Sequence, residues 1–281
     1  MSRHPIGVFD SGLGGLTVLR EIRSRLPQYD YIYLGDNKRA PYGPLDFETV
    51  YQYTLEAVQW LFGQGCPLVI LACNTASAKA LRNIQQKDLP RMGDAGLRVL
   101  GVIRPTTEVI GDYSQTRHIG ILGTTGTVNS GSYIIEIAKS FPDVRVYQQA
   151  CPEWVPLVES GDYLIPEKSM PIVRECLKAL VDRDEDIDTV LLACTHYPLL
   201  YPQIRAMLPP DIEVVSQGEI VAESLVDYFQ RHPEMDTRLS TDGEIVFYTS
   251  GDVDAFNQGA SMFWGNAVVA QHVGIGESVK R

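Results

Sequence analysis

Cysteine is scarce in this sequence, and its few positions argue against two common uses of the residue. Only 5 of the 281 residues are cysteine, an odd number, and no two of them form a C-x-x-C pair. A disulfide framework and a structural zinc site both depend on cysteines at recurring paired spacings. We therefore expect a cytoplasmic protein with no metal site.

Basic charge and long apolar runs are lacking too. The 24 Lys and Arg residues are outnumbered by 35 Asp and Glu residues, so the formal net charge is −11. Nucleic-acid binding without sequence preference needs a basic face, and we expect no nucleic-acid partner. No apolar run approaches the roughly 18 residues of a membrane span, and a strand starting at Ile6 leaves no room for a signal peptide. A small acidic ligand stays compatible with this charge, because local donors matter more to it.

One local pattern occurs twice. Residues 68–78 read LVILACNTASA, and residues 190–198 read VLLACTHYP. In each segment an apolar run ends in Ala-Cys, and a threonine follows within two residues. Such a run is typical of a buried parallel strand, and open α/β sheets bind ligands where their strands end. Cys73 and Cys194 are therefore predicted at two equivalent sheet edges.

The elements around these two segments repeat in the same order. The predicted strands of the first half are 6–9, 31–34, the apolar run from residue 68 that ends in Cys73, and 99–103. Those of the second half are the run from residue 119 that echoes 6–9, then 144–148, 190–193 and 212–215. Helices at 46–64 and 166–181 correspond, and so do loops at 35–44 and 151–161. Further predicted elements are a helix at 76–86, a polar loop at 87–96, a helix at 220–230, a strand at 245–248, a helix at 254–264 and a loose end at 274–281. A repeat of half the chain indicates a duplicated domain. We predict an α/β fold with two similar parallel-sheet lobes related by pseudo-two-fold symmetry, and a ligand site in the cleft between them.

The five cysteines differ in what they could do. Cys66 and Cys176 fit inert core residues, and Cys151 in a loop is ambiguous. Cys73 and Cys194 precede expected helix N-termini, which lower a thiol pKa from its reference of about 8.5. Their spacing alone fits a nucleophile, a metal pair or a redox pair.

Chemistry separates these alternatives only in part. Only His196 stands near either thiol as a further metal ligand, and a disulfide would close the cleft. A cysteine hydrolase of Cys194 and His196 would give Cys73 no task. Inversion of a stereocentre needs both thiols, because one base removes a proton from one face and an equivalent group returns one to the other.

Six blocks carry a resemblance to a known family. VFDSGLGGLTVL, YLGDNKRAPYG, LVILACNTASA, LGTTGTV, VPLVESG and LLACTHYPLL occur in this order. Together they resemble the glutamate racemases of the cofactor-independent aspartate/glutamate racemase superfamily. The resemblance implies interconversion of L- and D-glutamate without pyridoxal phosphate or any other cofactor, which supplies D-glutamate for peptidoglycan. It also implies a homodimer and discontinuous lobes, one of residues 1–99 plus 212–281 and the other of residues 100–211.

The resemblance further implies roles for single residues. Cys73 would act on D-glutamate and Cys194 on L-glutamate, with Asp10 and His196 as their acid/base partners and Glu159 in a similar role. The implied substrate-binding residues are Ser11, Tyr42, Gly43, Asn74, Thr75, Thr124, Thr127 and Thr195. Arg104 and residues 87–96 lie at positions expected to vary, where they bear on oligomer contacts and loop geometry.

Two other function classes stay open. A non-catalytic module that binds acidic amino acids would also have two lobes around a cleft, and would bind glutamate without exchanging its α-proton. A cysteine hydrolase would be labelled covalently at Cys194 and would be indifferent to Cys73→Ala.

Overall fold

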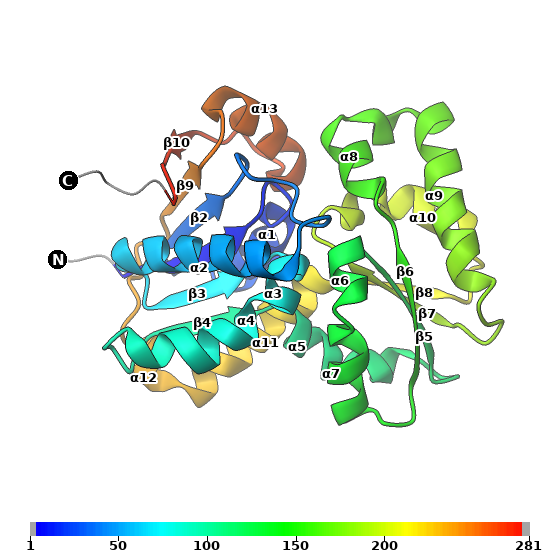
Figure 1. Cartoon of the computed structure of the whole chain (residues 1–281), viewed down its shortest axis with the longest axis horizontal. Coiled ribbons are helices and arrows are strands. Elements are labelled where there is room, and N and C mark those ends of the chain that lie inside the picture. Colours follow the sequence, from blue (N-terminus) through cyan, green and yellow to red (C-terminus); the bar gives the residue numbers. More distant parts are fainter. Residues whose placement is uncertain (1–3, 277–281) are drawn as a thin grey trace.

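The computed structural model describes residues 4–276, which form two α/β lobes lying side by side (Figure 1). Each lobe contains one parallel sheet, as the repeated strand pattern predicts. Residues 277–281, most of the end expected to be loose, lie outside the described residues. Within residues 4–276, the helices are all too short or too polar to cross a membrane.

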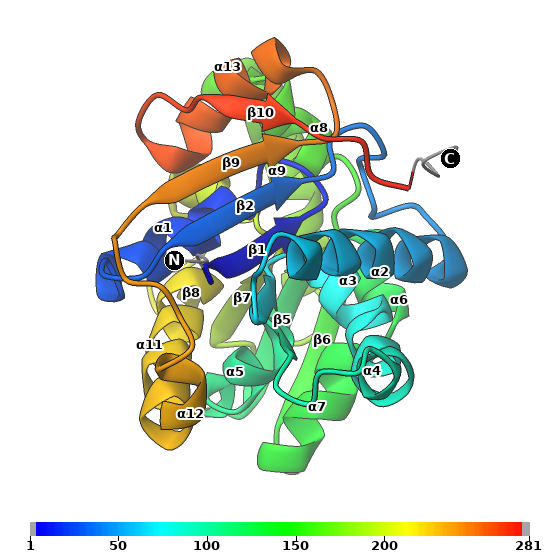
Figure 2. The ribbon, with the colours of Figure 1, turned by 90° about the vertical axis from the view of Figure 1, so that its left-hand side faces the viewer.

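The sheet of the first lobe has six parallel strands in the order β10-β9-β2-β1-β3-β4. These strands are β1 (Ile6–Asp10), β2 (Tyr31–Gly35), β3 (Leu68–Leu71), β4 (Arg98–Gly101), β9 (Ile245–Thr249) and β10 (Ala270–His272). Figure 2 shows β10, β9, β2 and β1 as neighbours in this sheet. Alternate residues of β1 enter different cores: Val8 packs in the cluster that contains Leu19, and Phe9 in the cluster that contains Val50. Burial on both faces explains why β1, β2 and β3, which are buried throughout, read as continuous apolar runs.

Helices cover both faces of this sheet. The one that carries Leu19 is α1 (Leu16–Arg25), and the one that carries Val50 is α2 (Phe47–Gly63). Asp46 caps α2 by accepting a hydrogen bond from the Thr49 N–H at 2.9 Å, which satisfies one of the free donors of the first turn. The remaining helical segments of this lobe are α3 (Asn74–Lys79), α4 (Leu81–Asn83), the π-helical turn η1 (Ile84–Asp88), the 3₁₀ turn η2 (Leu89–Arg91), α11 (Gln217–Arg231), α12 (Pro233–Asp236) and α13 (Val253–Trp264).

The sheet of the second lobe has four parallel strands in the order β6-β5-β7-β8. They are β5 (His118–Gly123), β6 (Arg145–Ala150), β7 (Thr189–Ala193) and β8 (Glu213–Ser216). The helical segments are α6 (Thr125–Asn129), α7 (Ser132–Ser140), α8 (Trp154–Glu159), η4 (Asp162–Leu164), α9 (Pro166–Val181), η5 (Tyr197–Leu200) and α10 (Tyr201–Met207). The order β6-β5-β7-β8 repeats the order β2-β1-β3-β4, so the predicted correspondence between the two halves of the chain holds at the level of strand order.

The chain crosses between the lobes twice. After β4 it enters α5 (Ile103–Thr107), which packs against α7 of the second lobe and is followed by η3 (Ile110–Tyr113). After β8 it enters α11, which packs against α1 of the first lobe. Helices α5 and α11 also pack against each other, so both crossings lie together.

Several predicted elements differ from the structure. The strand expected at 99–103 ends at Gly101, because α5 begins at Ile103. The loop expected at 151–161 contains α8, whose Trp154, Leu157 and Val158 are buried on one face. The helix expected at 76–86 is broken into short segments, and they continue into the expected loop at 87–96.

Two further differences concern the C-terminal part. Strand β8 pairs with β7, so the second sheet extends beyond the expected lobe boundary at residue 212. Strands β9 and β10 pair within the first sheet, and β10 had no counterpart among the predicted elements.

Candidate active site

Cys73 and Cys194 follow β3 and β7 at the carboxyl edges of the two sheets. Both thiols line one cavity of about 220 Å³ between the lobes, and each of the two residues is only 6% exposed. The two strand ends that the sequence predicts to be equivalent therefore meet at a single small cavity.

Most of the predicted site residues line this same cavity. They are Ser11, Tyr42, Gly43, Asn74, Thr75, Thr124, Glu159, Thr195 and His196. Asp10 and Thr127 are buried behind it instead. Asp10 accepts a hydrogen bond from the Thr195 hydroxyl at 3.4 Å, and Thr127 accepts one from the Thr124 hydroxyl at 3.1 Å. Asp10 and Thr127 are therefore each hydrogen-bonded to a residue that lines the cavity.

Cys73 is the N-cap of α3. Its Sγ accepts a hydrogen bond from the Ala76 N–H at 3.4 Å and donates one to Ser11 Oγ at 3.6 Å. Burial, and after it the negative charge of Asp10, raises the pKa of the Cys73 thiol to about 12. The expectation that a helix start lowers this pKa is therefore wrong for Cys73, because desolvation outweighs the bond from Ala76.

Cys194 has a basic neighbour instead. Its Sγ lies 4.0 Å from Nδ1 of His196, and Nε2 of His196 lies 3.0 Å from Oε1 of Glu159. Burial alone lowers the pKa of His196, but its hydrogen bonds to Cys194 and Glu159 outweigh burial and raise the pKa to about 10. His196 is therefore an imidazolium at neutral pH, placed between the Cys194 sulfur and the Glu159 carboxyl group. Phe263 of α13 packs edge-on against its ring, with centroids 5.2 Å apart.

Asp10 is the last residue of β1 and is completely buried. Its Oδ2 accepts a hydrogen bond from the Gly12 N–H at 2.9 Å. Burial raises the pKa of Asp10, against the positive charge of His196, which lowers it. Since the hydrogen bonds of this carboxylate come from Gly12 and Thr195, its influence on Cys73 is electrostatic.

Hydroxyl groups of the two lobes meet at one side of the cavity. Thr75 Oγ1 lies 2.9 Å from Thr124 Oγ1 and 3.4 Å from Thr127 Oγ1. Tyr42 also lines the cavity, but its hydroxyl donates to Asp36 at 2.5 Å. The Thr75 hydroxyl can serve a ligand as a donor, whereas Tyr42 offers its ring and the lone pairs of its oxygen.

Sequence reasoning missed the apolar wall of the cavity. Pro152, Val155 and Pro156 line it, and the last two belong to α8, the segment expected to be a loop. The apolar run VPLV was the available signal. None of the described residues that line the cavity is Lys or Arg, so apart from the His196 imidazolium the donors that would meet an anionic ligand there are neutral.

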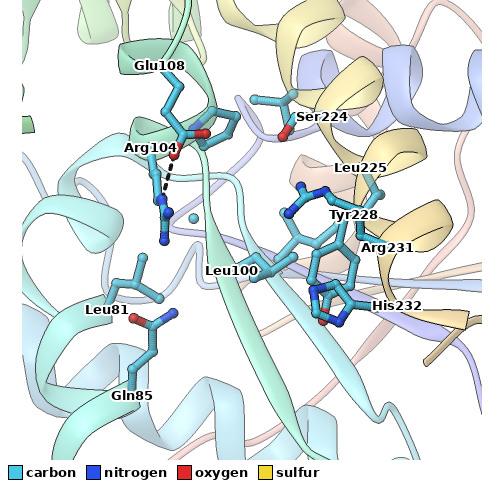
Figure 3. A pocket seen from close by; sticks show the side chains of 14 residues that line it. Leu81, Gln85, Leu100, Arg104, Glu108, Ser224, Leu225, Tyr228, Arg231 and His232 are labelled. Carbon is cyan, nitrogen blue, oxygen red and sulfur yellow. Dashed lines mark hydrogen bonds and ion pairs between the residues drawn. The ribbon is translucent and has the colours of Figure 1, made fainter. Parts of the chain in front are cut away.

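Other hollows of the molecule hold different chemistry. A cavity of about 280 Å³ lies between β4, α4, α5 and α11, with Arg104 and Glu108 on one side and Tyr228, Arg231 and His232 on the other (Figure 3). Arg104 donates to Glu108 at 2.8 Å, and no predicted catalytic residue lines this cavity.

Among the described residues one group could hold a metal ion, formed by His118, Asp184 and Asp186. It lies at the start of β5, away from the edge that carries the thiols.

The comparisons with known proteins agree with this geometry. Residues 11–225 match the family model described as Asp/Glu/hydantoin racemase. The chain is 42% identical to a glutamate racemase of Dinoroseobacter shibae over 268 residues, which cover 92% of this chain and 94% of that protein. It is similar to the crystal structure of a glutamate racemase isoform from Bacillus anthracis, with a TM-score of 0.87, 32% identity, and coverage of 97% of this chain and 98% of that one.

A further similar structure, a glutamate racemase from Francisella tularensis, was solved in complex with D-glutamate. Its TM-score is 0.83, its identity 28%, and the match covers 97% of this chain and 98% of that one. The family model and these relatives cover most of the chain, cavity residues included, and the chain therefore belongs to the Asp/Glu/hydantoin racemase family, within which it groups with the glutamate racemases.

Proposed function

We propose that this chain interconverts L- and D-glutamate without a cofactor, with Cys73 and Cys194 as two bases on opposite sides of the α-carbon. The observation that carries the proposal is that the two thiols, presented by corresponding strands of the two lobes, line one cavity. A second supporting observation is their difference in surroundings, one beside a buried carboxylate and one beside an imidazolium.

In the proposed reaction of L-glutamate, Cys194 is the base and Cys73 is the acid. The imidazolium of His196 places a positive charge beside the Cys194 sulfur, while the pKa of about 12 keeps Cys73 a neutral thiol. Cys194 would take the α-proton, which moves from Cα to Sγ, and Cys73 would deliver its proton from Sγ to the opposite face of Cα. D-Glutamate then leaves a thiolate at Cys73 and a thiol at Cys194, which is the arrangement that the reverse reaction needs.

The polar groups of the cavity suit a small amino acid with two carboxylates. Ser11 and Thr75 bring hydroxyl donors, and Asn74 brings an amide. Neutral donors can orient such a substrate between the two sulfur atoms, and holding the reacting atoms in line is itself a large part of catalysis. Glu159 is already paired with His196, so its negative charge is partly neutralised before a carboxylate enters.

The wider setting of the proposal comes from the family. D-Glutamate would serve peptidoglycan synthesis in the cytoplasm, and the chain would act as a homodimer. We also propose that two bodies close on the substrate. The first comprises residues 1–99 and the C-terminal segment that follows β8, and the second comprises the residues between them. The second boundary therefore lies after β8 and not at residue 212.

The other function classes are not favoured. A binding module for acidic amino acids would give the two thiols no task. A cysteine hydrolase of Cys194 and His196 would leave Cys73 unused.

The proposal is tested by incubating the purified protein with L-glutamate in D₂O, with no added cofactor. The α-proton is followed by NMR and the handedness by circular dichroism. Loss of both signals supports the proposal. Bound glutamate that keeps both signals contradicts it and favours the binding module. Exchange without inversion would mean that only one base works.

A further inference from the structure

Three buried side chains behind the cavity form a closed ring of hydrogen bonds. Asn74 Nδ2 donates to Gln217 Oε1 at 2.7 Å, Gln217 Nε2 donates to Tyr133 Oη at 2.7 Å, and Tyr133 Oη donates to Asn74 Oδ1 at 2.6 Å. All three residues are less than 5% exposed. Bonds this short between fully buried groups hold each partner in one orientation.

Groups outside the ring determine which atoms donate and which accept within it. The Thr106 hydroxyl donates to the Val102 carbonyl at 2.9 Å, so its oxygen is left to accept from Gln217 Nε2 at 3.0 Å. Gln217 Nε2 also lies 3.4 Å from the Val102 carbonyl. With its amide reversed, Gln217 would turn its oxygen toward two acceptors. The amide of Asn74 is therefore held with Oδ1 toward Tyr133 and Nδ2 toward Gln217.

The ring joins both lobes where the chain crosses between them. Asn74 opens α3 in the first lobe, and Tyr133 lies on α7 in the second. Gln217 is the first residue of α11, and Thr106 lies on α5, so each crossing contributes one of these residues. Of the ring residues only Asn74 lines the cavity. One amide of the cavity is therefore oriented by residues that depend on how the two lobes are placed.

We infer that Tyr133 and Gln217 are positioning residues, which hold the Asn74 amide in the orientation that receives the substrate. The ring uses one Nδ2–H and one lone pair of Oδ1, so Asn74 keeps a second donor and a second lone pair for a ligand. The inference rests on the proposed function, since it treats the cavity as the substrate site. Without the ring the amide can rotate, and the substrate must restrain it on binding.

The test compares two changes of the same kind, Tyr133→Phe and Tyr31→Phe. Tyr31 is also buried, and its hydroxyl donates to the Leu26 carbonyl at 2.7 Å at the start of β2, away from the cavity. Each change removes one buried hydroxyl. Racemisation is measured from both enantiomers, at equal amounts of folded protein judged by circular dichroism. We expect Tyr133→Phe to lower kcat/KM roughly tenfold, mostly through KM, and Tyr31→Phe to leave both constants unchanged.

A second pair of variants shows whether Tyr133 acts through Asn74. In an Asn74→Ala background, Tyr133→Phe should cost less than about twofold, because the amide that it orients is gone. Gln217→Met, which fills similar space without hydrogen bonds, should resemble Tyr133→Phe in its KM. Equal losses from Tyr133→Phe with and without Asn74 would overturn the inference, since they would indicate a purely structural role.

The outcomes separate this inference from the proposed function. A wild-type protein that exchanges no α-proton contradicts the proposed function, and the inference with it. An active wild-type protein whose Tyr133→Phe variant behaves like Tyr31→Phe contradicts the inference alone.

Discussion

The two thiol environments stand at corresponding places in the two lobes and differ in charge. Cys73 caps a helix and lies near the buried carboxylate of Asp10, which together with burial favours the neutral thiol. Cys194 lies beside an imidazolium that Glu159 holds in its charged form. The strands that carry the thiols are alike, so the difference arises from the few residues that follow or face each strand.

This comparison constrains what can be measured. Two enantiomers have equal free energy, so kcat/KM must be the same in both directions for every variant. A difference between the thiols can appear only in kcat and KM taken separately, or in which enantiomer exchanges its α-proton. The predictions below use these readouts.

Replacing either thiol should have the largest effect. Cys73→Ala and Cys194→Ala should each lower racemisation by about 10³-fold or more, because a base is lost on one face. In D₂O, Cys194→Ala should still exchange the α-proton of D-glutamate slowly through Cys73, without inversion. Cys66→Ala serves as the control, because it removes a buried thiol that lies just before β3. Full activity in either active-site variant would end the two-thiol mechanism.

Removing the imidazolium should be the next largest change. His196→Asn should lower kcat from L-glutamate about 10²-fold at neutral pH, because the positive charge beside the Cys194 sulfur is gone. The difference from wild type should shrink above about pH 10, where His196 of the wild type is itself neutral. A profile of kcat against pH for each enantiomer checks it, and a variant that loses kcat equally in both directions would contradict the asymmetry.

A substitution at Gly14 would displace the side chains beside Cys194 without changing any charge. A Cβ at Gly14 would lie 2.2 Å from Thr195 Oγ1 and 2.4 Å from His196 Nδ1, so both side chains must move. Gly14→Ala should therefore lower kcat about tenfold, in the pattern of His196→Asn. Gly63→Ala is a matched control, since a Cβ there meets nothing within 4 Å. Normal kinetics in Gly14→Ala would show that the position of His196 is not critical.

The smallest expected effect concerns the second partner of the histidine. Glu159→Gln removes a carboxylate 3.0 Å from His196 Nε2, so the pKa of His196 should fall from about 10. Because that pKa is raised on folding, the interaction stabilises the fold fully below about pH 6.5 and is lost as the pH rises through about 10. Wild type and variant should therefore differ most in Tm at pH 6 and converge above pH 10. Activity at neutral pH should fall by about threefold. Parallel Tm curves over this range would contradict the assignment.

Sequence patterns predicted what is local and missed what depends on folding. The apolar runs before Cys73 and Cys194 placed both at sheet edges, since strand and turn signals lie next to each other in the chain. Segment 151–161 contains two prolines, which hid the buried face of α8. The raised pKa of Cys73 follows from burial, which its neighbours in sequence do not reveal.

Sequence patterns do not predict the hydrogen-bonded ring of Asn74, Tyr133 and Gln217. Its members are separated by 59, 84 and 143 positions and carry no common motif. Only the way in which α5 and α11 cross between the lobes brings them together.

The shared strand order of the lobes has an evolutionary consequence. A homodimer of single-lobe chains would present two identical half-sites, because one gene specifies both, and any mutation beside one thiol would appear beside the other. In this chain each half is encoded separately. Asp10 could therefore arise beside one base and His196 beside the other, and each partner can drift or be selected without altering its counterpart.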